Sequence, residues 1–216
     1  MNIAISAAHS LEFSTFRRYM GKVNKLPLGA WQHYLWQHQD GRVILLETGI
    51  GPEMAAGAMK ALLQTYKIDC VVNFGSAGMI DDGLNVGDAF LADEIVDATS
   101  GYVLRTNVQI TEAMAAFLDE QNKGFVRGRL LTAPEPVVKR SHRLRLAEQF
   151  KVGAVDMEAY ALAQIALVKK VPFASLKMIS DRATALSRLE YWKNQPQIDR
   201  KLGTLVYGFL EYLKAA

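Results

Sequence analysis

The chain has few of the residues that extracellular, metal-dependent and membrane proteins depend on. Its single cysteine, Cys70, excludes an internal disulfide and lies in the apolar run CVVNF, which fits a packed thiol in the reducing cytoplasm. The four histidines, His9, His33, His38 and His142, are scattered and form no HExxH motif, so we expect no bound metal. No apolar stretch reaches the roughly 18 residues of a membrane span, and the first residues lack the basic start of a signal peptide. A cytoplasmic protein without a membrane span is therefore expected.

Charge of either sign is not in large excess. The 25 lysines and arginines are matched by 22 acidic residues, so composition does not indicate nucleic acid or another polyanion as a partner. The basic residues of segment 139–145 alternate with apolar ones, which favours a surface helix with one buried face. With 216 residues, 50% of them hydrophobic, and no repeat or linker, residues 1–216 are expected to form one compact α/β domain.

Apolar runs alternate with amphipathic segments, which is typical of a sheet covered by helices on both faces. Strands are predicted over residues 3–7, 31–37, 43–48, 71–74, 89–95, 126–132 and 173–179. Helices are predicted over about residues 52–66, 111–122, 141–150, 158–169 and 197–213. Because open α/β sheets bind ligands beyond the carboxyl ends of their strands, site residues are sought directly after these strands.

Two glycine-containing turns follow strands without matching the motifs they suggest. In TGIGP, at 48–52, Met54 stands where the third glycine of a dinucleotide-binding GxGxxG is required, so we expect no nicotinamide or other cofactor. We interpret it as a tight turn in which backbone N–H groups near Ile50 approach a small ligand. In FGSAG, at 74–78, Phe74 replaces the first glycine of a GxSxG nucleophile elbow. Ser76 is therefore predicted to make a polar contact before it acts as a nucleophile.

Five collinear motifs carry a family resemblance: TGIG (48–51), NFGSAG (73–78), VGDAFLADE (86–94), VDMEA (155–159) and MISD (178–181). In this order and spacing they resemble the purine nucleoside phosphorylase and nucleosidase superfamily, and within it the 5'-methylthioadenosine/S-adenosylhomocysteine nucleosidases. The resemblance implies a three-layer α/β fold with a central mixed β-sheet, partly rolled into a barrel and flanked by helices. It also implies a homodimer that acts on a small purine nucleoside.

The same resemblance implies roles for three carboxylates. Asp181 would protonate the departing purine, with Ser180 holding it in place, although this pair could instead cap the following helix. Glu158 would accept hydrogen bonds from the ribose hydroxyls, with Met157 packed on the sugar; a glutamate at a helix start could instead compensate the helix dipole. Glu12 would activate the attacking water, or be a solvated residue of a first helical turn.

Further contacts are implied for five residues. Ser76 would touch the water or a ribose hydroxyl, or bond its own turn. Val137, in a proline-rich loop, would contact the purine through its backbone. Lys177 stands where the family usually has an arginine near the water, and it could instead be a snorkelling strand residue. His9 would line the pocket for the 5' substituent or be a plain buried histidine, and Ile50 would lie in the ligand-binding turn.

The expected reaction is hydrolysis of the N-glycosidic bond of 5'-methylthioadenosine, S-adenosylhomocysteine or a related 5'-modified adenosine. Phosphorolysis is the closest alternative, but Asn73 stands where similar phosphorylases have a phosphate-binding arginine, and no arginine precedes Glu12. The connection 98–111 is shorter than is usual, which leaves a futalosine-like or hopanoid-linked nucleoside open. A non-catalytic nucleoside-binding protein is disfavoured because Glu12, Glu158 and Asp181 are all present.

Overall fold

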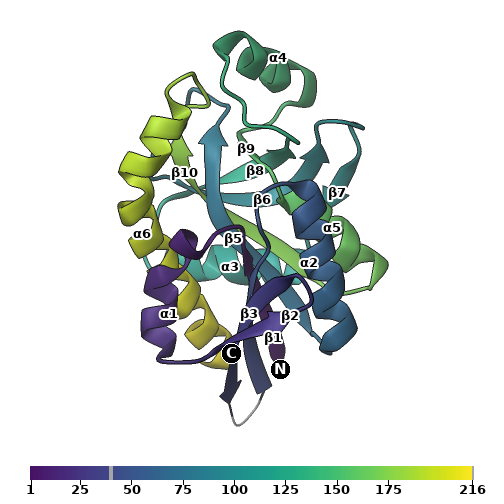
Figure 1. The fold of residues 1–216 in the computed structure, drawn as a ribbon. Coiled ribbons are helices and arrows are strands. Elements are labelled where there is room, and N and C mark those ends of the chain that lie inside the picture. Colours follow the sequence, from purple (N-terminus) through teal and green to yellow (C-terminus); the bar gives the residue numbers. More distant parts are fainter. Residues whose placement is uncertain (39–40, 216) are drawn as a thin grey trace.

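The computed structural model describes residues 1–38 and 41–215 and is shown in Figure 1. The strands are β1 (Asn2–Ala7), β2 (Lys25–Leu28), β3 (Trp31–His38), β4 (Gly41–Glu47), β5 (Cys70–Met79), β6 (Ala89–Asp97), β7 (Val103–Arg105), β8 (Phe125–Thr132), β9 (Ala154–Asp156) and β10 (Phe173–Asp181). The helices are the 3-10 turn η1 (Ser10–Glu12), α1 (Ser14–Met20), α2 (Pro52–Thr65), α3 (Val108–Glu120), α4 (Arg140–Phe150), α5 (Ala159–Val168) and α6 (Ser187–Ala215). None of the helices in the described part of the chain is both long and apolar enough to cross a membrane.

Five of the strands close into a barrel. In the order β5, β10, β6, β8 and β9, each strand pairs with the next, and β9 pairs with β5 to complete the ring. The pairings are both parallel and antiparallel. On its other side β5 pairs with β1, and the sheet continues outward through β4, β3 and β2. The predicted mixed sheet that is partly rolled into a barrel is thus confirmed.

Helices cover both faces of this sheet, because side chains alternate between the faces along each strand. Ile3 and Ile5 of β1 pack with α1, α3 and α6, whereas Ala4 between them packs with α2 and α5. In Figure 1 the helices α1 and α6 accordingly lie on one side of the strands, and α2 and α5 on the other. The three layers expected for the fold are therefore confirmed.

Two helices begin earlier than predicted, one because of a capping side chain and one because it continues through a proline. The helix predicted to start at residue 111 begins at Val108, because the side chain of Asn107 accepts a hydrogen bond from the N–H of Ile110. The last helix begins at Ser187, ten residues before the predicted start, and continues through Pro196. A proline inside a helix removes one N–H donor, which makes it a misleading stop signal. The short strands β2, β7 and β9 were not predicted.

Candidate active site

Three buried carboxylates gather at the carboxyl ends of the strands. Glu12 belongs to η1 after β1, Glu158 follows β9, and Asp181 is the last residue of β10. Their exposed fractions are 6%, 7% and 8%. Carboxylates are rarely buried to this degree unless other groups pair with them or donate hydrogen bonds to them. Two of them lie against β5, since a Cβ added at Gly75 would be 3.2 Å from the oxygens of Glu12 and one added at Gly78 would be 3.3 Å from Asp181 Oδ1. Glu158 accepts a hydrogen bond from the N–H of Gly51 in the turn before α2. We refer to Glu12, Glu158 and Asp181 as the site carboxylates.

Glu12 is held by three hydrogen bonds from two segments. Its Oε1 accepts from the N–H of Ser76 at 2.9 Å and from the hydroxyl of Ser76 at 2.5 Å, and its Oε2 accepts from the N–H of Ala8 at 3.0 Å. Gly75 makes room for this carboxylate, since a Cβ there would lie 3.2 Å from both of its oxygens. A carboxylate offers about four acceptor sites, so one site on Oε2 stays open for a further donor such as water. The interpretation of Glu12 as a solvated helix residue does not fit this burial.

Glu158 is turned away from the helix that it precedes. It is the N-cap residue of α5 but makes no side-chain capping bond, and its Oε1 accepts instead from the N–H of Gly51, at 2.8 Å. Burial, reinforced by the nearby charge of Asp156, raises the pKa of Glu158 to about 8, against the opposing charge of Lys177. Glu158 therefore holds a proton at neutral pH while its surroundings are unchanged.

Asp181 is oriented by its own strand end. Its Oδ2 accepts from the hydroxyl of Ser180 at 2.7 Å, and its Oδ1 accepts from the N–H of Ala183 at 2.9 Å. The same Ser180 hydroxyl lies 3.2 Å from the carbonyl of Ala77, and the amide of Asn194 donates to the carbonyl of Ser180. Ser180 thus holds Asp181, as expected, and the pair does not cap α6, which begins at Ser187.

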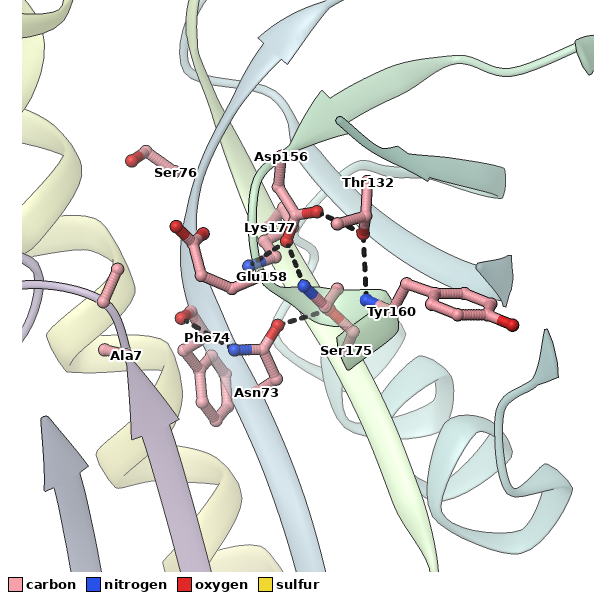
Figure 2. Close-up of polar contacts among 12 residues, drawn as sticks. Ala7, Asn73, Phe74, Ser76, Thr132, Asp156, Glu158, Tyr160, Ser175 and Lys177 are labelled. Carbon is pink, nitrogen blue, oxygen red and sulfur yellow. Dashed lines mark hydrogen bonds and ion pairs between the residues drawn. The ribbon is translucent and has the colours of Figure 1, made fainter. Parts of the chain in front are cut away.

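Lys177 forms a buried ion pair behind the site. Its Nζ lies 2.9 Å from Asp156 Oδ2, and the two side chains are 3% and 1% exposed. Burial disfavours the charged ammonium, but the negative charge of Asp156, joined by that of Glu158 once Glu158 is ionised, outweighs it and raises the pKa of Lys177. Asp156 also accepts from the hydroxyl of Thr132, as Figure 2 shows, and from the N–H of Ala159. Lys177 is therefore neither a snorkelling side chain nor an uncompensated cation.

Asn73 belongs to a buried polar network between strands. Its side-chain amide donates toward the carbonyl of Ser6 at 3.2 Å, and its Oδ1 accepts from the hydroxyl of Ser175 at 3.0 Å. The residue is 1% exposed, and Figure 2 shows the contact with Ser175. The position that would carry a phosphate-binding arginine in a phosphorylase is therefore occupied by an amide that bonds neighbouring strands.

The remaining predicted contacts lie in four different surroundings, and their part in ligand binding stays a prediction. Ile50 is 61% exposed in the turn before α2, and Met157 is half-buried beside Glu158. Val137 is buried in a small apolar cluster with Leu131. The half-exposed His9 caps η1, where its Nδ1 accepts from the N–H of Leu11 at 3.2 Å, so its ring has a local role that the sequence did not indicate.

The first turns of α6 contribute residues that the sequence did not reveal. Asn194 and Gln195 donate to the carbonyls of Ser180 and Leu11, and Tyr191 lies one turn earlier, where burial together with the charge of Glu12 raises its pKa. These three residues lie at i, i+3 and i+4, on one face of the helix. This spacing would have placed the three residues on one helix face in the sequence, but only if the helix had been predicted to start before Pro196.

Two surface cavities lie away from the site carboxylates. One, of about 980 Å³, is lined by the basic residues Arg17, Arg18 and Lys22 beside α1. The other, of about 330 Å³, is lined by Arg127 and Arg129 of β8 together with acidic partners. Neither is lined by a site carboxylate, so neither offers the acid and base that the carboxylate cluster provides.

Known proteins resemble this chain along nearly its whole length. The 5'-methylthioadenosine/S-adenosylhomocysteine nucleosidase of Haemophilus influenzae strain PittGG is 32% identical over 190 residues, covering 79% of this chain and 82% of that protein. The nucleosidase of the same name from Haemophilus ducreyi is 30% identical and covers 97% of both chains.

Solved structures share the fold. A futalosine hydrolase mutant from Helicobacter pylori superposes with a TM-score of 0.93 at 17% identity, covering 98% of this chain and 99% of that one. The Helicobacter pylori 5'-methylthioadenosine/S-adenosylhomocysteine nucleosidase, in complex with a substituted pyrrolidin-3-ol, superposes with a TM-score of 0.93 at 18% identity, covering 98% of both chains. A model of the phosphorylase superfamily matches residues 2–211. Because this match and the relatives at 30% identity or more span the fold and its carboxylate cluster, the chain belongs to the phosphorylase superfamily.

Proposed function

We propose that the protein hydrolyses the N-glycosidic bond of a purine nucleoside, with 5'-methylthioadenosine, S-adenosylhomocysteine or a related 5'-modified adenosine as substrate. The observation that carries this proposal is the gathering of three buried carboxylates, each held by different hydrogen bonds, at the carboxyl ends of the strands. The relatives at 30% identity or more bear the name of a nucleosidase with these two substrates, which supports the same reaction here.

The reaction needs an acid, a base and a support for the sugar. Asp181 gives its proton to N7 of the purine while the bond between C1' and N9 breaks and its electrons pass to the base. Water adds to C1' from the side of Glu12, whose open acceptor site on Oε2 takes a proton from that water. The products are the free base and the hydrolysed sugar; the proton on Glu12 returns to solvent, and Asp181 takes up a proton from solvent for the next turnover.

Glu158 is suited to bind the ribose because its buried environment disfavours the ionised carboxylate in the free protein. In the free protein its raised pKa, about 8, keeps the carboxyl group protonated at neutral pH. Glu158 releases this proton to solvent before bond cleavage, and the resulting carboxylate accepts hydrogen bonds from the ribose hydroxyls and faces the positive charge that develops on the ribose. The interaction is thus stronger in the transition state than in the ground state, as catalysis requires.

Water is favoured over phosphate as the nucleophile. Binding a phosphate dianion calls for cations that are free to pair with it. Asn73 is engaged with Ser6 and Ser175, and Lys177 is already neutralised by Asp156 at 2.9 Å. The part of the site that the structure describes therefore supports a neutral nucleophile next to Glu12.

The test is an assay of base release. The purified protein is incubated with 5'-methylthioadenosine, S-adenosylhomocysteine, adenosine, inosine and a futalosine-like nucleoside, each with and without phosphate. We expect release of the base from 5'-modified adenosines in phosphate-free buffer, with free sugar as the second product. Strict dependence on phosphate together with ribose 1-phosphate would make the protein a phosphorylase, and binding without turnover of any substrate would make it a nucleoside-binding protein.

We also propose that the protein works as a homodimer in the cytoplasm. Four apolar side chains on α2, its preceding turn and α5 are 45–72% exposed, which supports an interface there: Ile50, Met54, Leu167 and Val168. The free, buried Cys70 suits a reducing compartment. In solution the mass should be twice the 24.0 kDa of the chain, and Met54→Lys should lower it toward the monomer.

A further inference from the structure

Asp199 of α6 is a buried carboxylate outside the group of site carboxylates, and it is 5% exposed. Its Oδ2 accepts from the hydroxyl of Ser14 at 2.7 Å and from the hydroxyl of Thr15 at 2.6 Å. The N–H of Thr15 lies 3.2 Å from both carboxylate oxygens. These hydrogen bonds all go to the start of α1, so Asp199 takes no direct part in the acid–base chemistry.

Helix α1 starts without a capping residue of its own. Its N-cap residue is Phe13, whose side chain has no hydrogen-bonding atom, and no aspartate or glutamate stands in its first turn. The first N–H groups of a helix have no partner within the helix, and negative charge is favoured beside them. Asp199, 184 positions along the chain from Thr15, supplies both the acceptor and the charge. The start of α1 is therefore fixed by α6.

Helix α6 holds the chain on both sides of Glu12. The side-chain amide of Gln195 donates to the carbonyl of Leu11 at 3.0 Å, one residue before Glu12. Asp199 binds the start of α1, two and three residues after Glu12. Gln195 and Asp199 are four residues apart and lie on one face of the helix. Because the chain is tied to the same helix before and after Glu12, the backbone of Glu12 has little freedom to move.

A glycine permits the close approach of the two helices. One turn beyond Asp199, a Cβ at Gly203 would lie 2.6 Å from the backbone N of Phe16 and 2.7 Å from the Cβ of Thr15. A side chain there would push α1 away from α6, and the short side chain of Asp199 would no longer reach Thr15. Gln195, Asp199 and Gly203 stand at i, i+4 and i+8, so they form one stripe of α6 that faces the segment after β1.

We infer that Asp199, together with Gln195, is a positioning residue for the hydrolytic step, because it fixes the segment that carries Glu12. The inference rests on the proposed function for its kinetic consequence. Ser76 and Ala8 can donate to Glu12 only while the backbone of Glu12 stays in place. A general base must lie within hydrogen-bond reach of its water, and a small misplacement lowers the rate strongly.

The first test is Asp199→Asn, with Asp199→Ala as the more severe variant. Asparagine keeps one acceptor oxygen and should lower kcat about three- to tenfold, whereas alanine removes all the hydrogen bonds and should lower it about ten- to hundredfold. We expect KM to change by less than about twofold, because the residues proposed to hold the ribose and the base are untouched. Wild-type kcat in Asp199→Ala would overturn the inference.

The matched control is Tyr19→Phe. It removes the hydrogen bond between Tyr19 and Thr204, which joins the same two helices at a distance from Glu12 along the chain. The ring of Tyr19, which packs on Tyr207, is kept. Both kcat and KM should stay at their wild-type values in this variant.

A double-mutant cycle separates positioning of Glu12 from a general effect on the fold. Glu12→Gln removes the proposed base, and its residual rate is measured with protein in excess over substrate. If Asp199 acts through Glu12, adding Asp199→Asn to Glu12→Gln should cost almost nothing more in rate. An equal loss in the wild-type and Glu12→Gln backgrounds would show that Asp199 acts independently of Glu12, and the inference would fail.

A measurement without substrate distinguishes failure of the inference from failure of the proposed function. The N–H groups of Ser76 and Ala8 both donate to Glu12, so their hydrogen exchange reports how firmly the carboxylate is held. In Asp199→Asn both amides should exchange faster, while Val72, deeper in β5, should not change.

If the wild type hydrolyses no nucleoside, the proposed function fails, while exchange still shows whether Asp199 holds the Glu12 segment. Unchanged exchange at Ser76 and Ala8 contradicts the inference whatever the activity. A uniform rise that includes Val72 would show a general loosening of the fold and would contradict it as well.

Discussion

Ser76 gives both of its donors to one atom, since its N–H and its hydroxyl lie 2.9 and 2.5 Å from Glu12 Oε1. These two hydrogen bonds join β5 to the segment after β1 and fix the carboxylate that we propose as the base. It also accounts for the GSAG turn. Gly75 must lack a side chain for Glu12 to approach, and Ser76 must follow it to bind the carboxylate.

Gly75→Ala should disturb this contact directly. The added Cβ would lie 3.2 Å from both carboxylate oxygens of Glu12, at a φ of +155° that side chains rarely adopt. We expect a loss of about 1–3 kcal/mol in the free energy of unfolding and a fall in kcat, measured by denaturant titration and base release. Gly124→Ala is the control, because its Cβ would meet nothing within 4 Å. Equal behaviour of the two variants would contradict this prediction.

Asp181→Asn should abolish most of the activity without unfolding the protein. An amide can still accept from the N–H of Ala183 and bond to Ser180, but it has no acidic proton for the purine. We expect kcat to fall by about 10²–10⁴ with little change in KM, measured by release of free base. The control Asp119→Asn lies on the exposed end of α3 and should have wild-type kcat. Full activity in Asp181→Asn would remove Asp181 as the acid.

Glu158→Gln should make the free protein more stable at alkaline pH. The unfolded glutamate loses its proton near pH 4.5, whereas in the folded protein the pKa of Glu158 is about 8, so between these values the folded state binds more protons. Stability contributed by this group therefore falls as pH rises from about 4.5 to 8. Glutamine carries no such charge and can keep the bond to Gly51.

The gain in Tm for Glu158→Gln over wild type should be near zero at pH 4 and rise to the order of 5 °C at pH 9. Differential scanning calorimetry without ligand measures it. Glu120→Gln, at an exposed position, should give no pH-dependent difference. A gain that is the same at both pH values would mean that Glu158 is not the titrating group.

Lys177→Met should destabilise the fold through Asp156. Removing the ammonium leaves a carboxylate buried at 1% exposure without its cation, which costs about 3–5 kcal/mol in the free energy of unfolding. The double variant Asp156→Asn/Lys177→Met should recover part of this loss in chemical denaturation. Lys214→Met breaks an exposed pair with Glu211 and should cost less than about 0.5 kcal/mol. Normal stability combined with lost activity would instead place Lys177 at the attacking water.

Local patterns placed Glu12 and Asp181 at strand ends, but the family resemblance was needed to single out the site carboxylates. Apolar runs marked β1 and β10, and Glu12 and Asp181 were found because they follow or end those runs. Contacts between residues that are distant in the sequence could not be predicted. Glu158 bonds to Gly51 across 107 positions, and Lys177 faces Asp156 only because β10 and β9 both flank β5. Strand register around a barrel is set by long-range packing, which periodicity along one segment does not contain.

The first turns of α6 were missed for a local reason. Pro196 suggested that the helix starts after it, whereas the residues before it are already helical. Bonds from Asn194 and Gln195 to the loops beneath hold this part of the helix, and they compensate for the donor that proline removes. Tertiary contacts thus overrode the local signal at the one place where a residue of the site, Tyr191, was hidden.

Strand β5 belongs to both the barrel and the outer sheet, because β1 and β10 pair with its two edges. Ser76, which holds Glu12, is followed on β5 by Ala77, whose carbonyl lies 3.2 Å from the Ser180 hydroxyl that holds Asp181. A displacement of β5 therefore carries the supports of acid and base together. Such a displacement would move Glu12 and Asp181 in the same direction, so the distance between acid and base should change less than the position of either one.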